Sequence, residues 1–351
     1  MISKHCHTDE KVPVERLINI LYRTSDLLLG RFSQKAKIIA NVLFHEWQMN
    51  PLAPGFHEAF SDVSDDDVDT TFRKLDKESI RQIKKYLAGV RFIPAGCHDY
   101  FFYNTRKFFT PEEYEERKSK LKQLQAEQKK YHFPRSYNGA EIFLAHHGLR
   151  LLPASVHDYI RHGNFIDAGS CFGDSALIFL KHYAPQKVYA FEPSSGNRLT
   201  CRKYLKRNRI HPTKIELVPY GLGARNETIF FHELSGESNS LRNTEGATTE
   251  VEIRTLDSFR EENHLSSVKM IKADVEGMGL EMFLGAEKTI REERPLLSLS
   301  IYHNKEELFG IYRTLQEWDL NYHCMTRMLG WPTAGFAELS LIAYPAELNQ
   351  I

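Results

Sequence analysis

The chain has 351 residues, of which 42% are hydrophobic and 26% charged, and its 46 basic side chains balance its 46 acidic ones. This length predicts two domains, or one large domain with an elaborated end, and it is ample for a hydrophobic core. Zero net charge argues against nucleic acid as a partner, and no apolar run approaches the ~18 residues of a membrane span.

The first part of the chain has the apolar spacing of helices. Apolar residues recur every three to four positions over residues 14–29 and again over residues 38–47. Residues 61–69 carry five acidic side chains but lack the glycine and final glutamate of a calcium loop. We interpret this stretch as a solvated acidic loop.

A further helix is predicted before the sequence pattern changes from helices to alternating strands and helices. Thr110, Pro111 and Glu113 fit an N-cap, a first helical residue and a capping box, and they predict a mostly polar helix over residues 112–130. We therefore expect a helical region over residues 1–136. Three roles remain open for it: covering an acceptor site, forming a homo-oligomer interface or binding a partner.

Beyond the breaker-rich segment at residues 131–139, strands and helices alternate. The β-rich runs lie at residues 164–168, 187–191, 214–220, 268–273, 296–302 and 339–344. Helical patterns lie between most of them, at residues 175–183, 197–208, 280–292 and 305–318. A hairpin is expected to interrupt the rhythm at residues 228–232 and 250–254. The alternation predicts a second domain over residues 137–351, an α/β fold with helices on both faces of a parallel sheet.

The sharpest signal is the sequence FIDAGSCFGDSA at residues 165–176. A predicted strand ends at Asp167, and Gly169 and Gly173 form a turn before the next helix. Ligands of open α/β sheets bind at such a turn, because glycine lets the backbone approach a ligand and the helix presents free N–H groups. Glu192 ends the next strand, where a carboxylate can accept hydrogen bonds from ribose hydroxyls. The alternative interpretation is that Gly169 and Gly173 only form a tight turn and that Glu192 faces solvent. It does not explain why the loop and the carboxylate both follow strand ends.

The loop favours one nucleotide cofactor over another. Cys171 stands where the dinucleotide fingerprint G-x-G-x-x-G has its second glycine. Asp167, directly before the loop, would repel a pyrophosphate but suits an amino group. S-adenosyl-L-methionine (SAM) carries an ammonium, a carboxylate and a ribose but no phosphate, so it fits better than NAD. An NAD-dependent oxidoreductase is kept as the less favoured alternative.

Two later strand ends carry further candidate groups. Asp274 and Glu276 follow the run at residues 268–273, and alternate residues of an extended chain face the same way. His303 follows the run at residues 296–302. Exposed carboxylates and a backbone-satisfied histidine are the ordinary interpretations. Their common place at the edge of the sheet makes them candidates for acid–base chemistry.

The ordered motifs resemble the FkbM-type SAM-dependent methyltransferases. Besides the glycine loop they are YAFEP at 189–193, RTLDSF at 254–259, KMIKADVEG at 269–277 and LGA at 284–286, with HHGL at 146–149 and SIYH at 300–303. The resemblance covers about residues 137–346. It implies a class I SAM-dependent methyltransferase fold, a Rossmann-like, mostly parallel sheet of seven strands with an antiparallel last strand. It also implies O-methylation of a hydroxyl on a saccharide or secondary-metabolite acceptor, a small molecule or a glycan.

The resemblance also assigns roles to individual residues. Those that would hold the methionine part of SAM are Asp167, Gly169, Ser170, Gly173, Asp174 and Ser175. Glu192 would bind the ribose, and Tyr220 and Gly221 would border the adenine. Asp274 and Glu276 would lie between cofactor and acceptor, with Asp274 also contacting the cofactor.

Two positions depart from the family pattern. Gly279 stands where the family commonly has a second glutamate, and Cys171 stands where it often has asparagine. Gly279 therefore lacks the carboxylate that the family has at this position, and Cys171 offers a thiol in place of the amide of asparagine. These departures motivate a second hypothesis, a degenerate SAM-binding or scaffold module without turnover.

The mechanism expected from the sequence is an in-line transfer of the methyl group, after which S-adenosyl-L-homocysteine (SAH) remains. A hydroxyl acceptor must lose its proton as the bond forms. We hypothesise that His303 is the base, because histidine titrates near neutrality, and that Asp274 orients cofactor or acceptor, with Glu276 as a further candidate. A divalent metal held by the two carboxylates is kept open, and sensitivity to EDTA tests it.

The cysteines and the N-terminus bear on the compartment. The five cysteines, at positions 6, 97, 171, 201 and 324, include no C-x-x-C pair and predict reduced thiols. The first residues lack the apolar core of a secretory signal. We therefore expect a cytoplasmic protein.

Overall fold

The structure is a computed structural model, which describes residues 47–49, 56–91, 102–104, 109–133, 139–231, 249–333 and 338–349. Within these ranges, no helix combines the length and the apolar character needed to cross a membrane. The helices expected over residues 14–29 and 38–47 lie outside them, apart from Trp47. That residue begins a strand, β1 (Trp47–Met49), rather than lying in a helix.

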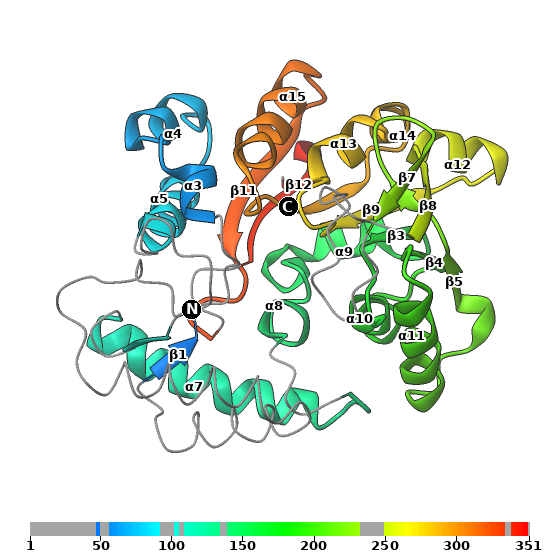
Figure 1. Cartoon of the computed structure of the whole chain (residues 1–351), viewed down its shortest axis with the longest axis horizontal. Helices are drawn as coiled ribbons and strands as arrows, with labels where there is room; N and C mark the ends of the chain where they lie inside the picture. Colours follow the sequence, from blue (N-terminus) through cyan, green and yellow to red (C-terminus); the bar gives the residue numbers. More distant parts are fainter. Residues whose placement is uncertain are drawn as a thin grey trace.

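Seven strands form the central sheet (Figure 1). In chain order they are β3 (Asn164–Ala168), β4 (Lys187–Phe191), β5 (Ile215–Val218), β9 (Val268–Ala273), β10 (Leu296–Ser300), β11 (Tyr322–Met328) and β12 (Leu339–Pro345). In space the order is β11-β12-β10-β9-β3-β4-β5. Strand β12 runs antiparallel to both of its neighbours, β10 and β11, and every other pair of neighbouring strands is parallel. The expected mostly parallel sheet with an antiparallel last strand is therefore confirmed.

The register of three central strands brings the predicted motifs together. Ala168, the last residue of β3, lies opposite Phe191 of β4 and Ala273 of β9, which are also the last residues of their strands. The residues that follow these strands therefore leave the sheet at one edge. The strand order also reverses at β3, and ligands of α/β sheets bind at such a switch point.

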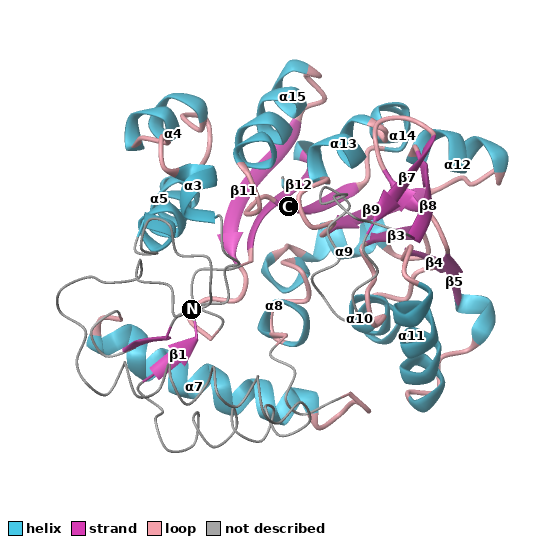
Figure 2. Cartoon of the chain, in the orientation of Figure 1, coloured by secondary structure: helices cyan, strands magenta, loops and turns pink. Residues whose placement is uncertain are grey.

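Helices cover both faces of this sheet (Figure 2), as the alternation predicts. One face packs against α9 (Ala154–Ile160) and α10 (Asp174–His182), and α10 packs in turn against α8 (Ala140–Phe143) and α11 (Ser195–Arg207). The helices on the other face are α12 (Leu256–Glu262), α13 (Gly279–Leu284), α14 (Glu287–Glu293), the π-helix η4 (Glu306–Ile311) and α15 (Tyr312–Glu317).

A small second sheet follows β5. Its strands are β6 (Gly221–Leu222), β7 (Glu227–Phe231) and β8 (Thr249–Arg254). Strands β7 and β8 pair antiparallel, which confirms the expected hairpin. Strand β6 begins directly at Gly221, so the hairpin is anchored beside the edge where the central strands end.

The described part of the N-terminal region packs on the free edge of the central sheet through one helix and against α8 through another. Its elements are α3 (Phe56–Phe60), α4 (Asp65–Thr71), α5 (Lys77–Arg91), α7 (Pro111–Gln128) and β2 (Phe102–Asn104), which pairs with β1. Apolar residues of α5 share one core with the sheet. The backbone N–H of Thr326 on β11 donates to Ser79 Oγ at 3.0 Å, and that of Met328 donates to Gln82 Oε1 at 2.6 Å. The division of the chain at residue 137 remains a prediction.

Of the two N-terminal predictions that the structure describes, the capping box is confirmed and the acidic loop is wrong. The capping box of Thr110 and Glu113 is present at the start of α7, as expected. The solvated acidic loop at residues 61–69 was wrong, because Ser64 caps helix α4 and forms a capping box with Asp67. Acidic residues in the first turn of a helix are stabilised by the positive end of its dipole.

Three other elements differ from the sequence expectation. The helix predicted over residues 280–292 is broken after α13, where Gly285 packs so tightly that a Cβ atom there would lie 2.0 Å from the carbonyl oxygen of Gly223. The helix predicted over residues 305–318 begins as the π-helix η4. Strand β11 was not predicted from the pattern, because its sequence YHCMTRM contains no β-branched residue except Thr326.

Candidate functional site

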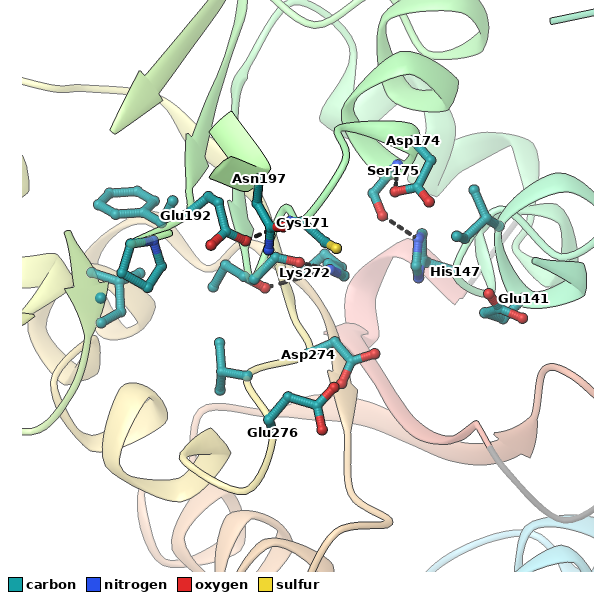
Figure 3. A pocket seen from close by; sticks show the side chains of 18 of the residues that line it. Glu141, His147, Cys171, Asp174, Ser175, Glu192, Asn197, Lys272, Asp274 and Glu276 are labelled. Carbon is teal, nitrogen blue, oxygen red and sulfur yellow. Dashed lines mark hydrogen bonds between the residues drawn. The ribbon is translucent and has the colours of Figure 1, made fainter. Parts of the chain in front are cut away.

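A cavity opens at the edge where β3, β4 and β9 end (Figure 3). Its lining comes from the turns after these strands, from the start of α10 and from segments before β3 and after β10. The predicted site residues that line it are Gly169, Asp174, Ser175, Glu192, Tyr220, Gly221, Asp274 and Glu276. Asp167, Ser170, Gly173 and His303 do not line it. Each of these four residues contacts a residue that lines the cavity or is adjacent to one in the sequence.

The glycine loop is packed too tightly for side chains at two positions. Gly169 has φ +73°, and a Cβ atom there would lie 1.8 Å from the carbonyl oxygen of Asp274. Gly173 has φ +77°, and a Cβ atom there would lie 2.3 Å from Cys201 Sγ. Positive φ and close approach both require glycine. The loop therefore lies directly against the segment that carries the two predicted catalytic carboxylates.

Glu192 closes the other side of the loop. Its Oε2 accepts a hydrogen bond from the backbone N–H of Cys171 at 2.9 Å, and its Oε1 accepts one from the N–H of Ser194 at 2.8 Å. Burial raises the pKa of this carboxyl, although the hydrogen bonds oppose that rise. The contact with Cys171 uses the backbone, so the unusual side chain at that position does not disturb it.

Asp167 forms a buried ion pair instead of facing the cavity. Its carboxylate is fully buried and lies 3.1 Å from Lys272 Nζ, which also donates to the carbonyl oxygen of Gly169 at 2.9 Å. Burial alone would lower the pKa of Lys272, but the carboxylates of Asp167 and Asp274 outweigh it and raise that pKa. The ion pair thus fixes a carbonyl group of the glycine loop. Sequence reasoning missed Lys272, although a lysine inside a buried strand was a usable signal.

His303 lies beneath the two carboxylates of the β9 turn. Its side chain is 7% exposed, and its Nε2 lies 3.4 Å from Asp274 Oδ1 and 3.7 Å from Glu276 Oε2. Its Nδ1 lies 2.8 Å from Glu307 Oε2. Burial alone would lower the pKa of this ring, but the charge and hydrogen bond of Glu307, followed by the charges of the other two carboxylates, raise it to about 10. The ring is therefore protonated at neutral pH and cannot accept another proton there.

Further carboxyl groups that the sequence did not single out line the cavity beside Asp274. Burial and the neighbouring charge of Glu338 raise the pKa of Glu141 well above its usual value. Burial and the charge of Asp274 raise the pKa of Glu338 to about 8. Tyr302, whose hydroxyl lies 3.5 Å from Glu338 Oε1, completes this side of the cavity. No local motif marked these residues, because they come from segments far apart in the chain.

His147 lines the cavity at the start of α10. Its Nε2 lies 2.7 Å from Ser175 Oγ, and burial lowers the pKa of the ring well below its usual value. The neutral ring and the hydroxyl therefore form a pair at the N-terminus of α10. As for metals, the described part of the chain contains no group of three or more His, Cys, Asp or Glu residues arranged to hold an ion.

Comparisons with known proteins agree with this architecture. The sequence model described as the Methyltransferase FkbM domain matches residues 167–324. The solved structure of methyltransferase FkbM from Methylobacillus flagellatus KT aligns at 17% identity and a TM-score of 0.51, over 79% of this chain and 58% of that one. The chain thus spans less than two thirds of that protein's length. No curated protein matches the sequence.

Two other solved structures align over most of their own length. One is an O-methyltransferase from Bacillus cereus in complex with SAH, at 11% identity and a TM-score of 0.36, over 68% of this chain and 92% of that one. The other is an rRNA methylase from Streptococcus thermophilus, at 12% identity and a TM-score of 0.37, over 58% and 95%.

Proposed function

Residues 167–324 match the model of the Methyltransferase FkbM domain, and we propose that the protein transfers a methyl group from SAM to a hydroxyl of a saccharide or secondary-metabolite acceptor. The observation that carries this proposal is the shape of the sheet edge. A glycine loop that admits no Cβ at position 169 lies between two carboxylates, Glu192 and Asp274, around one cavity.

The chemistry of the lining fits SAM better than a dinucleotide. Among the described residues of the lining, Lys272 is the only lysine or arginine, and Asp167 and the loop carbonyl of Gly169 already occupy its Nζ. A pyrophosphate would thus meet carboxylates and no available side-chain cation. Asp274 Oδ1 is shielded from solvent and makes no hydrogen bond, and its ion-pair partner is the His303 ring 3.4 Å away.

We assign the parts of SAM to three parts of the cavity. Glu192 would bind the ribose, because its carboxylate is already held at the mouth of the loop by two backbone N–H groups. Tyr220 and Gly221 would border the adenine. The start of α10, with Asp174 and Ser175, would hold the methionine part, and His147 joins this group through Ser175.

The residues of the chain then have two tasks during transfer. When bound, SAM supplies a methyl group on a sulfonium, which is already activated, so positioning of the reactants and exclusion of water are the main contributions of the protein. A group must also accept the acceptor's proton as the new C–O bond forms. Because His303 is already protonated, we assign this role to Asp274 and an orienting role to His303, the reverse of the sequence hypothesis. Glu276 remains a second candidate, and EDTA treatment tests whether the two carboxylates need a divalent ion.

Binding is the first experiment. Calorimetry with SAH and with NADH separates the two cofactor hypotheses, and we expect saturable binding of SAH only. Gly169→Ala places a Cβ 1.8 Å from a backbone oxygen and is expected to weaken SAH binding at least tenfold, as an order of magnitude for a strained loop. Gly196→Ala is the control, because a Cβ there meets nothing closer than 3.8 Å. Tight NADH binding would contradict the proposal.

Turnover is the second experiment. A labelled-methyl transfer assay over sugars, nucleotide sugars and lipid-linked glycans, read by mass spectrometry, tests for an acceptor hydroxyl. Methylated product supports the enzyme. SAH binding without transfer to any acceptor would instead favour the degenerate binding module that Gly279 and Cys171 motivated.

The proposal includes a small-molecule or glycan partner and no nucleic acid. It retains the cytoplasmic location expected from the sequence. Among the described residues, Cys171, Cys201 and Cys324 form no disulfide. Assembly into a homo-oligomer through the N-terminal helices stays a prediction, which light scattering tests.

A further inference from the structure

We propose that Glu307 is a positioning residue for this site: acting through His303, its carboxylate holds Asp274 where cofactor and acceptor meet. The effect on cofactor binding rests on the proposed function, whereas the contacts of Glu307 are present in the protein without a ligand. Glu307 lies outside the cavity lining and on η4, a π-helix, and single π-helical turns often occur at functional sites.

The carboxylate of Glu307 joins two turns that follow neighbouring strands. Its side chain is 1% exposed. Oε1 accepts a hydrogen bond from the backbone N–H of Gly279 at 2.8 Å, in the segment after β9. Oε2 accepts hydrogen bonds from the N–H and Nδ1 of His303, at 3.3 and 2.8 Å, in the segment after β10. A buried carboxylate satisfied in this way is costly to disturb, because each donor would lose its partner.

The local sequence makes room for this carboxylate and aims it. A Cβ atom at Gly279 would lie 2.8 Å from Glu307 Oε1, so only glycine leaves the space that the carboxylate fills. Asn304 holds the same two segments, because its Nδ2 donates to the carbonyl oxygen of Gly277 at 3.0 Å and its Oδ1 accepts from the N–H of Glu307 at 2.8 Å. Gly279 thus replaces the second glutamate of the family pattern and leaves space for the carboxylate of Glu307 from η4.

The ring of His303 transmits this arrangement to the cavity. With Nδ1 held by Glu307, Nε2 faces Asp274 Oδ1 at 3.4 Å and Glu276 Oε2 at 3.7 Å. Tyr302 stacks on the ring with centroids 4.1 Å apart. Phe56 of α3 approaches the ring at an interplanar angle of 45°, with centroids 6.5 Å apart.

The charged surroundings keep the ring a cation. Carboxyl groups face it from three segments: Glu307 from η4, Asp274 and Glu276 from the turn after β9, and Glu338 from the segment before β12. A cation between these groups attracts the two cavity carboxylates toward the ring. Loss of Glu307 would remove the partner that fixes both the orientation and the charge of the ring.

The test is a double-mutant cycle on the full chain, read by calorimetry with SAH. We expect Glu307→Gln to weaken SAH binding about tenfold or more, because the amide cannot accept from Nδ1 with the same charge. In the His303→Gln background the same substitution should change the affinity less than twofold. Glu306→Gln, one residue earlier on η4 and exposed, is the matched control and should leave binding unchanged. Equal losses in both backgrounds would show a merely structural role and overturn the proposal.

A second readout separates this inference from the proposed function. The imidazole of His303, followed by NMR in the free protein, should titrate near pH 10 in the wild type and at a lower pH in Glu307→Gln, where Asp274 and Glu276 are the carboxylates left beside the ring. Gly279→Ala displaces the same carboxylate and serves if Glu307→Gln does not fold. Absence of SAH binding in the wild type would contradict the proposed function, and the titration alone would then decide: a wild-type ring that titrates near neutrality overturns the inference.

Discussion

Single buried charges decide how the motif residues of this protein act. Asp167 is fully buried, and Lys272, whose side chain is 5% exposed, is its partner at 3.1 Å. An acidic residue before a glycine loop suggests a direct contact with the amino group of SAM. Here it instead fixes a lysine that holds the loop carbonyl of Gly169. The pair therefore orders the backbone of the loop that lines the cavity.

The pair makes a stability prediction. Lys272→Met leaves the Asp167 carboxylate buried without a cation, and removal of one partner of a buried ion pair costs about 3–5 kcal/mol. Urea unfolding followed by circular dichroism measures the change in the free energy of unfolding. Lys269→Met on the same strand is the control. A loss below about 1 kcal/mol for Lys272→Met would contradict the buried pair.

Glu338 makes a pH prediction at the same scale. Burial and the charge of Asp274 raise the pKa of Glu338 to about 8 in the folded protein, above its ordinary value. The folded state therefore binds a proton that the unfolded state releases, so the stability that this group contributes at low pH is lost as pH rises toward 8. Glu338→Gln should become more stable relative to wild type between pH 5 and pH 8.5. Parallel pH curves for the two proteins in thermal melts would rule this out.

At the scale of elements, the site residues that could be predicted from the sequence are those that follow the ends of strands. The runs ending at Ala168, Phe191 and Ala273 were read from local patterns, and their common register places Gly169, Glu192 and Asp274 together. Any parallel sheet brings the carboxyl ends of its strands to one edge. The sequence was therefore sufficient for the glycine loop and for the carboxylates that face it.

Elements without a local signal escaped prediction. Strand β11 lacks β-rich composition and is stabilised by its pairing with β12 and by α5. The break after α13 depends on the contact of Gly285 with Gly223, which no window of sequence contains. The same reason hid Glu141, Glu338 and Glu307: each meets the site only through the tertiary fold.

Helix α5 supports the site from the other end of the chain. The hydroxyl of Tyr86, which is fully buried, donates to the carbonyl oxygen of Tyr302, the residue before His303. Tyr86→Phe leaves that buried oxygen without its donor and should cost about 1–3 kcal/mol of unfolding free energy. Thermal or urea unfolding measures it, with the half-buried Tyr204→Phe on α11 as control. Equal stability of Tyr86→Phe and wild type would show that this contact contributes nothing.

At the scale of the whole molecule, helices α3, α4 and α5 share one core with the sheet, whereas α7 packs in a separate cluster with α8 and α10. Phe60 and Tyr86 pack in the same apolar cluster as Leu308 and Leu341. Phe56 approaches the rings of Tyr302 and His303, so α3 lies beside the part of the cavity that Tyr302 lines. Of the roles open for this region, covering the acceptor site is the one that these contacts favour.

The central claim is that one cavity at the end of β3 binds the adenosyl methyl donor. A crystal of the full chain grown with saturating SAH tests it most directly. We predict density for the ribose against Glu192, for the adenine beside Tyr220 and for the homocysteine part along the loop at Gly169. An empty cavity under saturating SAH, or SAH bound elsewhere on the molecule, would contradict the account.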